Sequence, residues 1–413
     1  MLKKPYVDTS FAENYFISLY GEKTDFQRNR YKNAFENFKN TFNVENAYVA
    51  SSSGRVEVCG NHTDHNGGKV LSCAISLDTL AMFLPSNENV IYIKSEGYPD
   101  IKVNLADDDF EEKGTSSALV KGVVVAMKNK GYKVGGFFAT FTSNVLGGAG
   151  ISSSASFEVL VAEILNFLYN DGKISPHEKA VIAQYSENVY FGKPCGLLDQ
   201  TAIAFGGLKK LDFSDKTKIN VTEIDNSLSD YTLILINTGG SHANLTDEYA
   251  SIPSEMFSVA KAMGKERLVD VDKNYFFSSI PNFMNKVSDR AVLRAIHFYQ
   301  ENERVDKACD ALSSNDYDLF LTAVKESGIS SLNKLQNCYV SGSLDQAIPK
   351  ALAISNEFLN GGVNRVHGGG FAGSILNIVK NENVDDFIKG VSAFFNKDCI
   401  IPLRVRSVGT IVL

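Results

Sequence analysis

The chain has 413 residues, of which 44% are hydrophobic and 22% are charged, a balance typical of a folded globular protein and not of a disordered one. Lysine and arginine number 41 against 48 aspartates and glutamates, so the net charge is -7. Because the net charge is negative and the sequence has no dense basic run, nucleic acid is not expected as a partner.

No signal peptide or membrane span is expected, because the most apolar stretch, 70–84, is broken by Ser72, Ser76 and Asp78. The six cysteines form no C-x-x-C pair, which is typical of reduced thiols in a cytoplasmic protein. The length favours two domains, and we place their boundary near residue 213, giving domains 1–213 and 214–413.

Residue patterns predict a mixture of helices and strands along the whole chain. Scattered aromatic residues predict surface helices in 11–45, and apolar residues at 3.6-residue spacing predict a helix that begins within 152–156 and ends near 170. Further helices are expected at 175–191, 289–299 and 344–358. Strands are expected at 55–58, 90–94, 137–142, 231–237, 373–379 and 404–413.

A glycine- and serine-rich segment, LGGAGISSSA at 146–155, lies between a predicted strand and a predicted helix. Glycines allow the backbone to pass close to a ligand, and the start of a helix offers free N–H groups to an anion. The segment therefore suggests a phosphate-binding loop, although it matches neither the Walker A pattern nor G-x-G-x-x-G. The alternative is a flexible glycine turn with ordinary serine caps.

A second glycine run, HGGGFAG at 367–373, precedes a predicted strand. It indicates either a ligand that approaches the backbone or a tight loop between a helix and a strand.

The segment GRVEVCGNHTDHNGG at 54–68 concentrates polar side chains at the end of a predicted strand. Its hydrogen-bonding groups suit a ligand with many hydroxyls. A zinc site formed by His62, Asp64 and His65 is the rival interpretation, but their spacing does not match a known four-ligand pattern.

The segment GLLDQ at 196–200 follows a predicted helix that carries Glu187. Asp199 at this turn is either a helix cap or a base that accepts a hydroxyl proton, and spacing alone does not choose between them.

Taken in this order, these segments resemble the galactokinases, members of the GHMP kinase superfamily of homoserine, mevalonate and phosphomevalonate kinases. Residues 54–68 look like the signature GRVNLIGEHTDYNGG, 152–156 like the serine-rich ATP loop, and 368–371 like the third motif. The resemblance extends from about residue 50 to the C-terminus. It implies an α+β fold with an N-terminal ribosomal-protein-S5-like domain, a C-terminal ferredoxin-like domain, and the active site between them.

The resemblance also implies a reaction, the transfer of the ATP γ-phosphoryl group to the anomeric hydroxyl of a galactose-type sugar. Asp199 would accept the hydroxyl proton, Arg55 would stabilise the transition state, and Ser154 and Glu187 would hold Mg²⁺. The residues implied for sugar binding are Asn61, His62, Thr63, Asp64, Gly196 and Tyr249. Those implied for ATP binding are Ser95, Gly148, Ala149, Gly150, Ile151, Ser152, Ser153 and Ser154.

Two departures from the signature keep alternatives open: Asn61 stands where the family has Glu, and His65 where it has Tyr. A neutral Asn61 would remove repulsion toward a C6 carboxylate, so a galacturonate kinase is one alternative. The other is a sugar sensor without activity, which the presence of Arg55, Glu187 and Asp199 argues against. We expect a cytoplasmic monomer whose partner is a small sugar.

Overall fold

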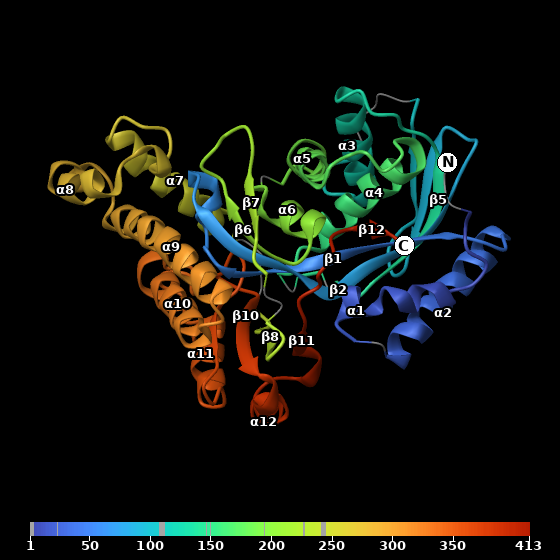
Figure 1. Cartoon of the computed structure of the whole chain (residues 1–413). Helices are drawn as coiled ribbons and strands as arrows, with labels where there is room; N and C mark the ends of the chain where they lie inside the picture. Colours follow the sequence, from blue (N-terminus) through green and yellow to red (C-terminus); the bar gives the residue numbers. More distant parts are fainter. Residues whose placement is uncertain are drawn as a thin grey trace.

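The computed structural model describes residues 4–22, 24–106, 112–145, 147–148, 150–193, 195–225, 228–240 and 245–413. Helices surround two β-sheets, of eight and four strands in this part of the chain (Figure 1). The expected α+β class is confirmed.

The first sheet is built on two long antiparallel strands that run through the middle of the molecule (Figure 1). Its order is β12-β1-β2-β5-β3-β4, with β6 paired to the first part of β2 and β7 paired to β6. The strands are β1 (Tyr48–Cys59), β2 (Lys69–Pro85), β3 (Val90–Ser95), β4 (Ile101–Asn104), β5 (Phe137–Ser143), β6 (Leu208–Asp212), β7 (Asn220–Glu223) and β12 (Ile411–Val412).

Both faces of this sheet are covered, because successive side chains of a strand point to opposite sides. Ala50 and Phe83 pack with the helices on one face, whereas Val49 and Met82 pack with α1 and α2 on the other. The helices of this half are α1 (Phe16–Tyr20), α2 (Asp25–Phe42), α3 (Ser116–Asn129), α4 (Ser153–Tyr169), α5 (Pro176–Tyr185) and α6 (Leu198–Phe205).

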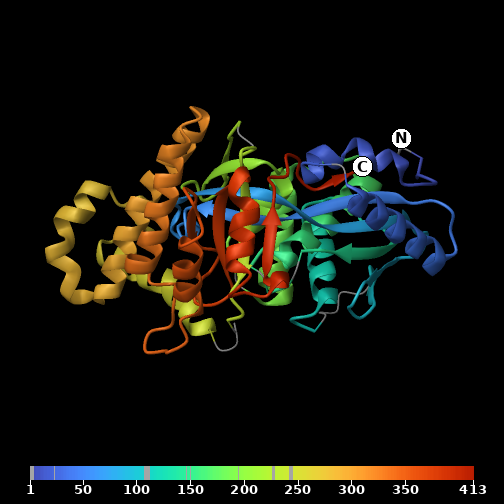
Figure 2. The same ribbon diagram turned by 90° about the horizontal axis from the view of Figure 1, so that it is seen from below.

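The second sheet is antiparallel and shares a hydrophobic core with the first, in which Leu71 and Ile75 pack with Leu233 and Leu376. Seen from below, its red strands lie in front of the long blue strands (Figure 2). Its order is β11 (Ile400–Leu403), β8 (Tyr231–Asn237), β10 (Ser374–Lys380) and β9 (Val363–Val366). The accompanying helices are α7 (Thr246–Ala262), α8 (Lys273–Phe283), α9 (Asp289–Ser313), α10 (Tyr317–Ser330), α11 (Ala347–Asn356) and α12 (Val384–Val391).

Most predicted elements are confirmed. The predicted strands correspond to parts of β1, β3, β5, β8 and β10, and the predicted helices correspond to α2, α4, α5, α9 and α11. The helix expected at 175–191 is α5 followed by a π-helical stretch, Ser186–Phe191, which carries Glu187. β2 was not predicted.

The strand expected at 404–413 is largely wrong, because only Ile411–Val412 form β12. The preceding backbone bends so that the fully buried guanidinium of Arg406 reaches the carbonyls of Ser51 and Gly409, at 3.1 and 2.8 Å. A buried guanidinium needs several acceptors, and a straight strand would not supply them.

Residue 213 lies between β6 and β7, which belong to the same sheet, and β12 returns to that sheet from the end of the chain. The division into domains 1–213 and 214–413 stays a prediction. Within the described residues, no helix is both long and apolar enough to cross a membrane.

Candidate active site

The three glycine-rich segments singled out in the sequence meet at one place. The N–H of Arg55 donates to Ile151 O at 3.2 Å, which joins the second half of β1 to the glycine–serine loop. The Asn61 side chain, in the turn after β1, donates to Gly368 O at 2.8 Å, which joins the segment 54–68 to the third segment. A Cβ atom on Gly54 would lie 2.7 Å from Ile151 O, so this close approach requires glycine.

The glycine–serine loop ends at the start of α4 in a form suited to an anion. Gly148, Gly150 and Ser152 all have positive φ, and Ser152 as N-cap makes no side-chain bond to the first turn of the helix. The N–H groups of that turn are therefore not capped by Ser152. Ala149 lies outside the described residues.

Asp199, near the start of α6, lies against both the loop and Arg55. Arg55 Nε and Nη2 lie 2.8 and 2.7 Å from Asp199 Oδ1, and Ser152 Oγ donates to Asp199 Oδ2 at 2.5 Å. Arg55 Nη1 also donates to Gly150 O at 2.5 Å. The side chain of Asp199 is 31% exposed, so a substrate can reach it. The geometry fits a base that the guanidinium orients.

Glu187 and Ser154 form a second cluster of oxygen atoms beside this one. Ser154 Oγ donates to Glu187 Oε1 at 2.9 Å, and Lys193 Nζ lies 3.0 Å from the same oxygen. Gln200 Nε2 donates to Glu187 Oε2 at 2.8 Å. Lys193, which the sequence analysis did not single out, thus places a cation against Glu187, one of the two residues predicted to hold a metal.

Two of the residues expected to bind sugar, His62 and Tyr249, contact the turn at 368–370. His62 Nε2 is 3.0 Å from Gly369 O, and Tyr249 Oη donates to Gly370 O at 2.9 Å. The carbonyl partner requires that His62 Nε2 carries the hydrogen. Burial lowers the pKa of His62 to about 4, so its ring is neutral at pH 7.

Asp64 and Gly196 are in direct contact. A Cβ atom on Gly196 would lie 2.1 Å from Asp64 Oδ2, so the carboxylate occupies the space that a side chain would fill. Loss of hydration raises the pKa of Asp64 to about 6, and the negative charge of Asp199 adds to the effect.

Two expected site residues lie further from this centre. Thr63 is buried, and its hydroxyl oxygen lies 3.0 Å from Gly60 O and 2.8 Å from Lys69 O, so its single hydrogen is used within the loop. Ser95 ends β3, and the turn after it brings the Tyr98 hydroxyl within 3.9 Å of the Cβ position of Gly147.

Asn61 is buried next to His62, one of the residues expected to bind sugar, with an exposed fraction of 1%. Its amide nitrogen donates to Glu57 Oε1 and Gly368 O, both at 2.8 Å, and its oxygen accepts from Asn337 Nδ2 at 2.8 Å. The amide thus uses both of its hydrogens within the protein.

Glu57 was not singled out in the sequence analysis, although position 57 also departs from the quoted signature. Burial raises the pKa of its carboxyl to about 7, and Arg365, 3.3 Å away, opposes this effect.

A three-ligand zinc centre at His62, Asp64 and His65 finds no support in the geometry. His65 Nδ1 contacts Asn66 Nδ2 at 2.8 Å, whereas His62 faces Gly369. The described residues contain no group of three or more His, Cys, Asp or Glu side chains placed to hold a metal ion.

Comparison with solved structures defines the class of protein. The chain superposes on Lactococcus lactis galactokinase complexed with galactose with a TM-score of 0.77, at 23% identity, over 98% of this chain and 99% of that chain. For Methanococcus jannaschii mevalonate kinase the TM-score is 0.60, at 16% identity, over 86% and 98%. Residues 118–207 match the model of the GHMP kinases N terminal domain. The chain therefore has the GHMP kinase fold.

Sequence comparison narrows this class. Residues 36–85 match the galactokinase galactose-binding signature. The galactokinase of Clostridium tetani is 32% identical over 351 residues, 84% of this chain and 87% of that protein, and that of Bacillus subtilis is 29% identical over 356 residues. The chain belongs to the galactokinase family.

Proposed function

We propose that the protein transfers the γ-phosphoryl group of ATP to the anomeric C1 hydroxyl of galactose. The observation that carries this proposal is the contact of Asp199 with both Arg55 and Ser152. This contact supports Asp199 as the base, because Ser152 belongs to the glycine–serine loop and Arg55 to the segment that matches a galactose-binding signature. The galactose complex of the Lactococcus lactis relative supports the choice of sugar.

Positioning and electrostatic stabilisation do most of the work in phosphoryl transfer. Asp199 accepts the proton of the C1 hydroxyl, which becomes the nucleophile. Arg55 orients that carboxylate and stabilises the negative charge that develops on the transferred group.

The nucleotide is held through its phosphates at the glycine–serine loop, where the N–H groups at the start of α4 contact the phosphate oxygens. The residues proposed for this contact are Gly148, Ala149, Gly150, Ile151, Ser152, Ser153 and Ser154, with Ser95 nearer the nucleoside.

The sugar hydroxyls are held by His62, Asp64, Tyr249 and the backbone of Gly196. Asp64 accepts hydrogen bonds, and the neutral His62 ring offers its free Nδ1 as a further acceptor. Thr63 and Asn61 support this loop from behind, as their contacts within the protein indicate.

Mg²⁺ is proposed at Ser154 and Glu187. Oxygen ligands suit this ion, and few protein ligands suffice because phosphate oxygens and water complete its coordination. The ammonium of Lys193 beside Glu187 supports the fit, since it stands in as a cation there. Bound Mg²⁺ would neutralise charge on the triphosphate. A monomeric state and a cytoplasmic location also remain proposals.

The test of the function is ADP release from the wild type with galactose, galacturonate, N-acetylgalactosamine and arabinose as acceptors. We expect galactose to have the highest kcat/KM. A kcat/KM at least tenfold higher for galacturonate, which corresponds to about 1.4 kcal/mol, would contradict the proposal.

The metal proposal predicts opposite effects at two neighbouring positions. Glu187→Gln should raise the Mg²⁺ concentration needed for half-maximal rate at least tenfold, about 1.4 kcal/mol. Lys193→Met should lower this concentration by about 1.5- to 5-fold, because it removes a competing cation. The Lys193 side chain is 62% exposed, and an ion pair made by such an exposed lysine is worth about 0.2–1 kcal/mol. The measurement is a Mg²⁺ titration at fixed ATP. Curves that shift in the same direction for both variants would place the metal elsewhere.

The raised pKa of Asp64 predicts a pH dependence of sugar binding. As the pH falls through about 6, the carboxylate takes up a proton and loses an acceptor, so the KM for galactose should rise. Asp64→Asn should have a higher KM at pH 7.5 but should lack this rise between pH 7 and 5. If Asp64→Asn shows the same rise in the KM for galactose between pH 7 and 5 as the wild type, a group other than Asp64 causes that rise.

A further inference from the structure

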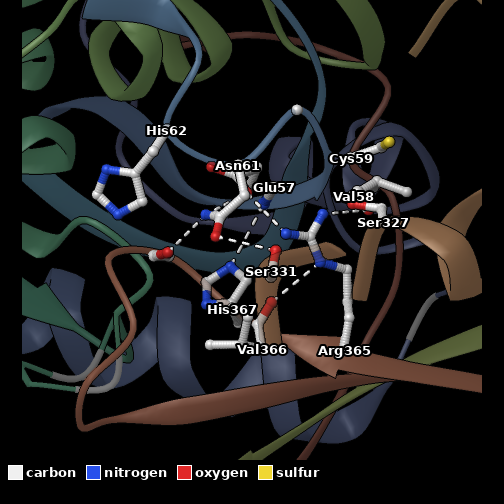
Figure 3. A network of polar contacts seen from close by, with 12 residues as sticks. Glu57, Val58, Cys59, Asn61, His62, Ser327, Ser331, Arg365, Val366 and His367 are labelled. Carbon is white, nitrogen blue, oxygen red and sulfur yellow. Dashed lines mark hydrogen bonds and ion pairs between the residues drawn. The ribbon is translucent and has the colours of Figure 1, made fainter. Parts of the chain in front are cut away.

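The buried pair formed by Glu57 and Asn61 reverses the two residues that the quoted signature has at these positions. In GRVNLIGEHTD the amide stands at position 57 and the carboxylate at position 61, whereas this chain has the carboxylate at 57 and the amide at 61. The two side chains contact each other directly, through Asn61 Nδ2 and Glu57 Oε1 at 2.8 Å (Figure 3). The carboxyl group has therefore moved by four residues and has not been lost.

The Glu57 carboxylate has a fixed place between β1 and β9. Arg365, fully buried on β9, lies 3.3 Å from Glu57 Oε1 and also donates to Val58 O and Val366 O, at 2.9 and 3.0 Å. The backbone N–H of Glu57 donates to His367 Nε2 at 3.3 Å. Figure 3 shows these groups around the carboxylate. An uncompensated charge on Arg365 in this buried setting would be costly, so the carboxylate has a structural partner.

Asn61 connects Glu57 to the residues proposed to bind the sugar. Its amide also holds Gly368 O, and the next two carbonyls of that turn contact His62 and Tyr249. The carbonyl of Asn61 itself accepts from His297 Nε2 of α9 at 2.9 Å. A shift of Asn61 therefore moves both the loop that carries His62 and the turn opposite it.

We infer that Glu57 and Asn61 act as one transposed carboxylate–amide pair that positions the sugar-binding loop against the turn at 368–370. Glu57 is a positioning residue, because it acts through Asn61 and Arg365 and not on the substrate. The inference rests on the proposed function for its kinetic readout.

This pair changes the expectation for sugar choice at position 61. The neutral side chain of Asn61 alone would favour an acidic sugar, but a carboxylate lies 2.8 Å behind it. Asn61→Glu would place two carboxylates in contact in a buried setting, and it would lose the donor to Gly368 O. We therefore expect this single variant to damage galactose activity.

The test compares Glu57→Asn, Asn61→Glu and the double variant with the wild type. Each single variant should raise the KM for galactose about tenfold or more and lower the unfolding temperature, while the KM for ATP changes less than threefold. The kcat/KM of the double variant should be at least tenfold higher than that of the worse single variant, because the double variant again has one carboxylate and one amide beside Arg365. Losses that multiply in the double variant would overturn the inference.

Glu57→Gln keeps the shape and the acceptor for Asn61 but removes the charge beside Arg365, so it covers the case in which the other variants do not fold. It should raise the KM for galactose about 3- to 10-fold with kcat within threefold. An unchanged KM in folded Glu57→Gln would overturn the inference.

Asp78→Asn is the matched control, since Asp78 is a buried carboxylate near two arginines, Arg30 and Arg406. Its side chain also accepts from Tyr20 and Ser51, and none of these four partners is proposed to bind galactose. The variant should lower the unfolding temperature and leave the KM for galactose unchanged; a rise in KM equal to that of the Glu57 variants would show that the effect at Glu57 is general destabilisation.

If the wild type does not phosphorylate galactose, the proposed function fails, whereas non-additive unfolding temperatures of the swapped variants still test the pair.

Discussion

Asp199→Asn should lower kcat by about 10²- to 10⁴-fold, the usual contribution of a general base, while galactose and ATP still bind. Asparagine keeps the shape of the side chain but cannot accept the hydroxyl proton. It also weakens the contacts of 2.7 and 2.8 Å with Arg55, so the guanidinium loses its fixed orientation. The measurements are the steady-state rate and calorimetric binding of each substrate.

Asp306→Asn is a matched control for this experiment. Asp306 is an ion-paired carboxylate with a similar exposed fraction, 37% against 31%, and its partners are Lys69 and Lys210. Its replacement should leave kcat within about twofold, because no part of the proposed mechanism uses it. Turnover within threefold of the wild type in a folded Asp199→Asn variant would remove Asp199 from the proton transfer.

Elements with a complete local pattern could be predicted from the sequence. α4 and β8 are examples, because the apolar residues of α4 follow a 3.6-residue period and those of β8 form one continuous run at 233–236. The α+β class followed from such elements together with the resemblance to a known family.

β2 could not be predicted in the same way, because polar residues interrupt it. Asp78 is fully buried in β2, and its partners Arg30 and Arg406 come from α2 and from near the C-terminus. Ser72 donates to Val56 O of the neighbouring strand at 2.7 Å. These polar groups are acceptable inside the protein only because of partners that are distant in sequence.

In the candidate site, too, contacts between residues that are distant in the chain could not be predicted. The residues proposed to contact the substrates lie within short motifs, so the sequence pattern points to them. The sequence pattern does not point to the residues that hold these motifs in place. Arg365 and Asn337 contact Glu57 and Asn61 from about 300 residues away in the chain. Position 57 was nevertheless detectable, since it departs from the signature together with position 61.

Gly196→Ala should raise the KM for galactose about 10- to 100-fold, the usual cost of losing a hydrogen bond to a charged group. The added Cβ would lie 2.1 Å from Asp64 Oδ2, so the carboxylate must rotate away from the place where it would meet the sugar. Gly196 does not have a positive φ, so alanine fits its backbone conformation. The three heavy atoms nearest to the added Cβ all belong to the Asp64 side chain. The fold should therefore persist, with kcat and the KM for ATP changed less than threefold.

The same contact makes the origin of this effect testable in a second background. In Asp64→Ala the clashing oxygen is gone, so adding Gly196→Ala should raise the KM for galactose less than twofold further, although the alanine is damaging in the wild type. Such non-additivity is expected of two residues that act through one contact. If the two changes multiply instead, Gly196 affects the sugar by a route other than Asp64, such as its own backbone groups. The measurement is a double-mutant cycle on kcat/KM for galactose, with the unfolding temperature of each variant as the check on folding.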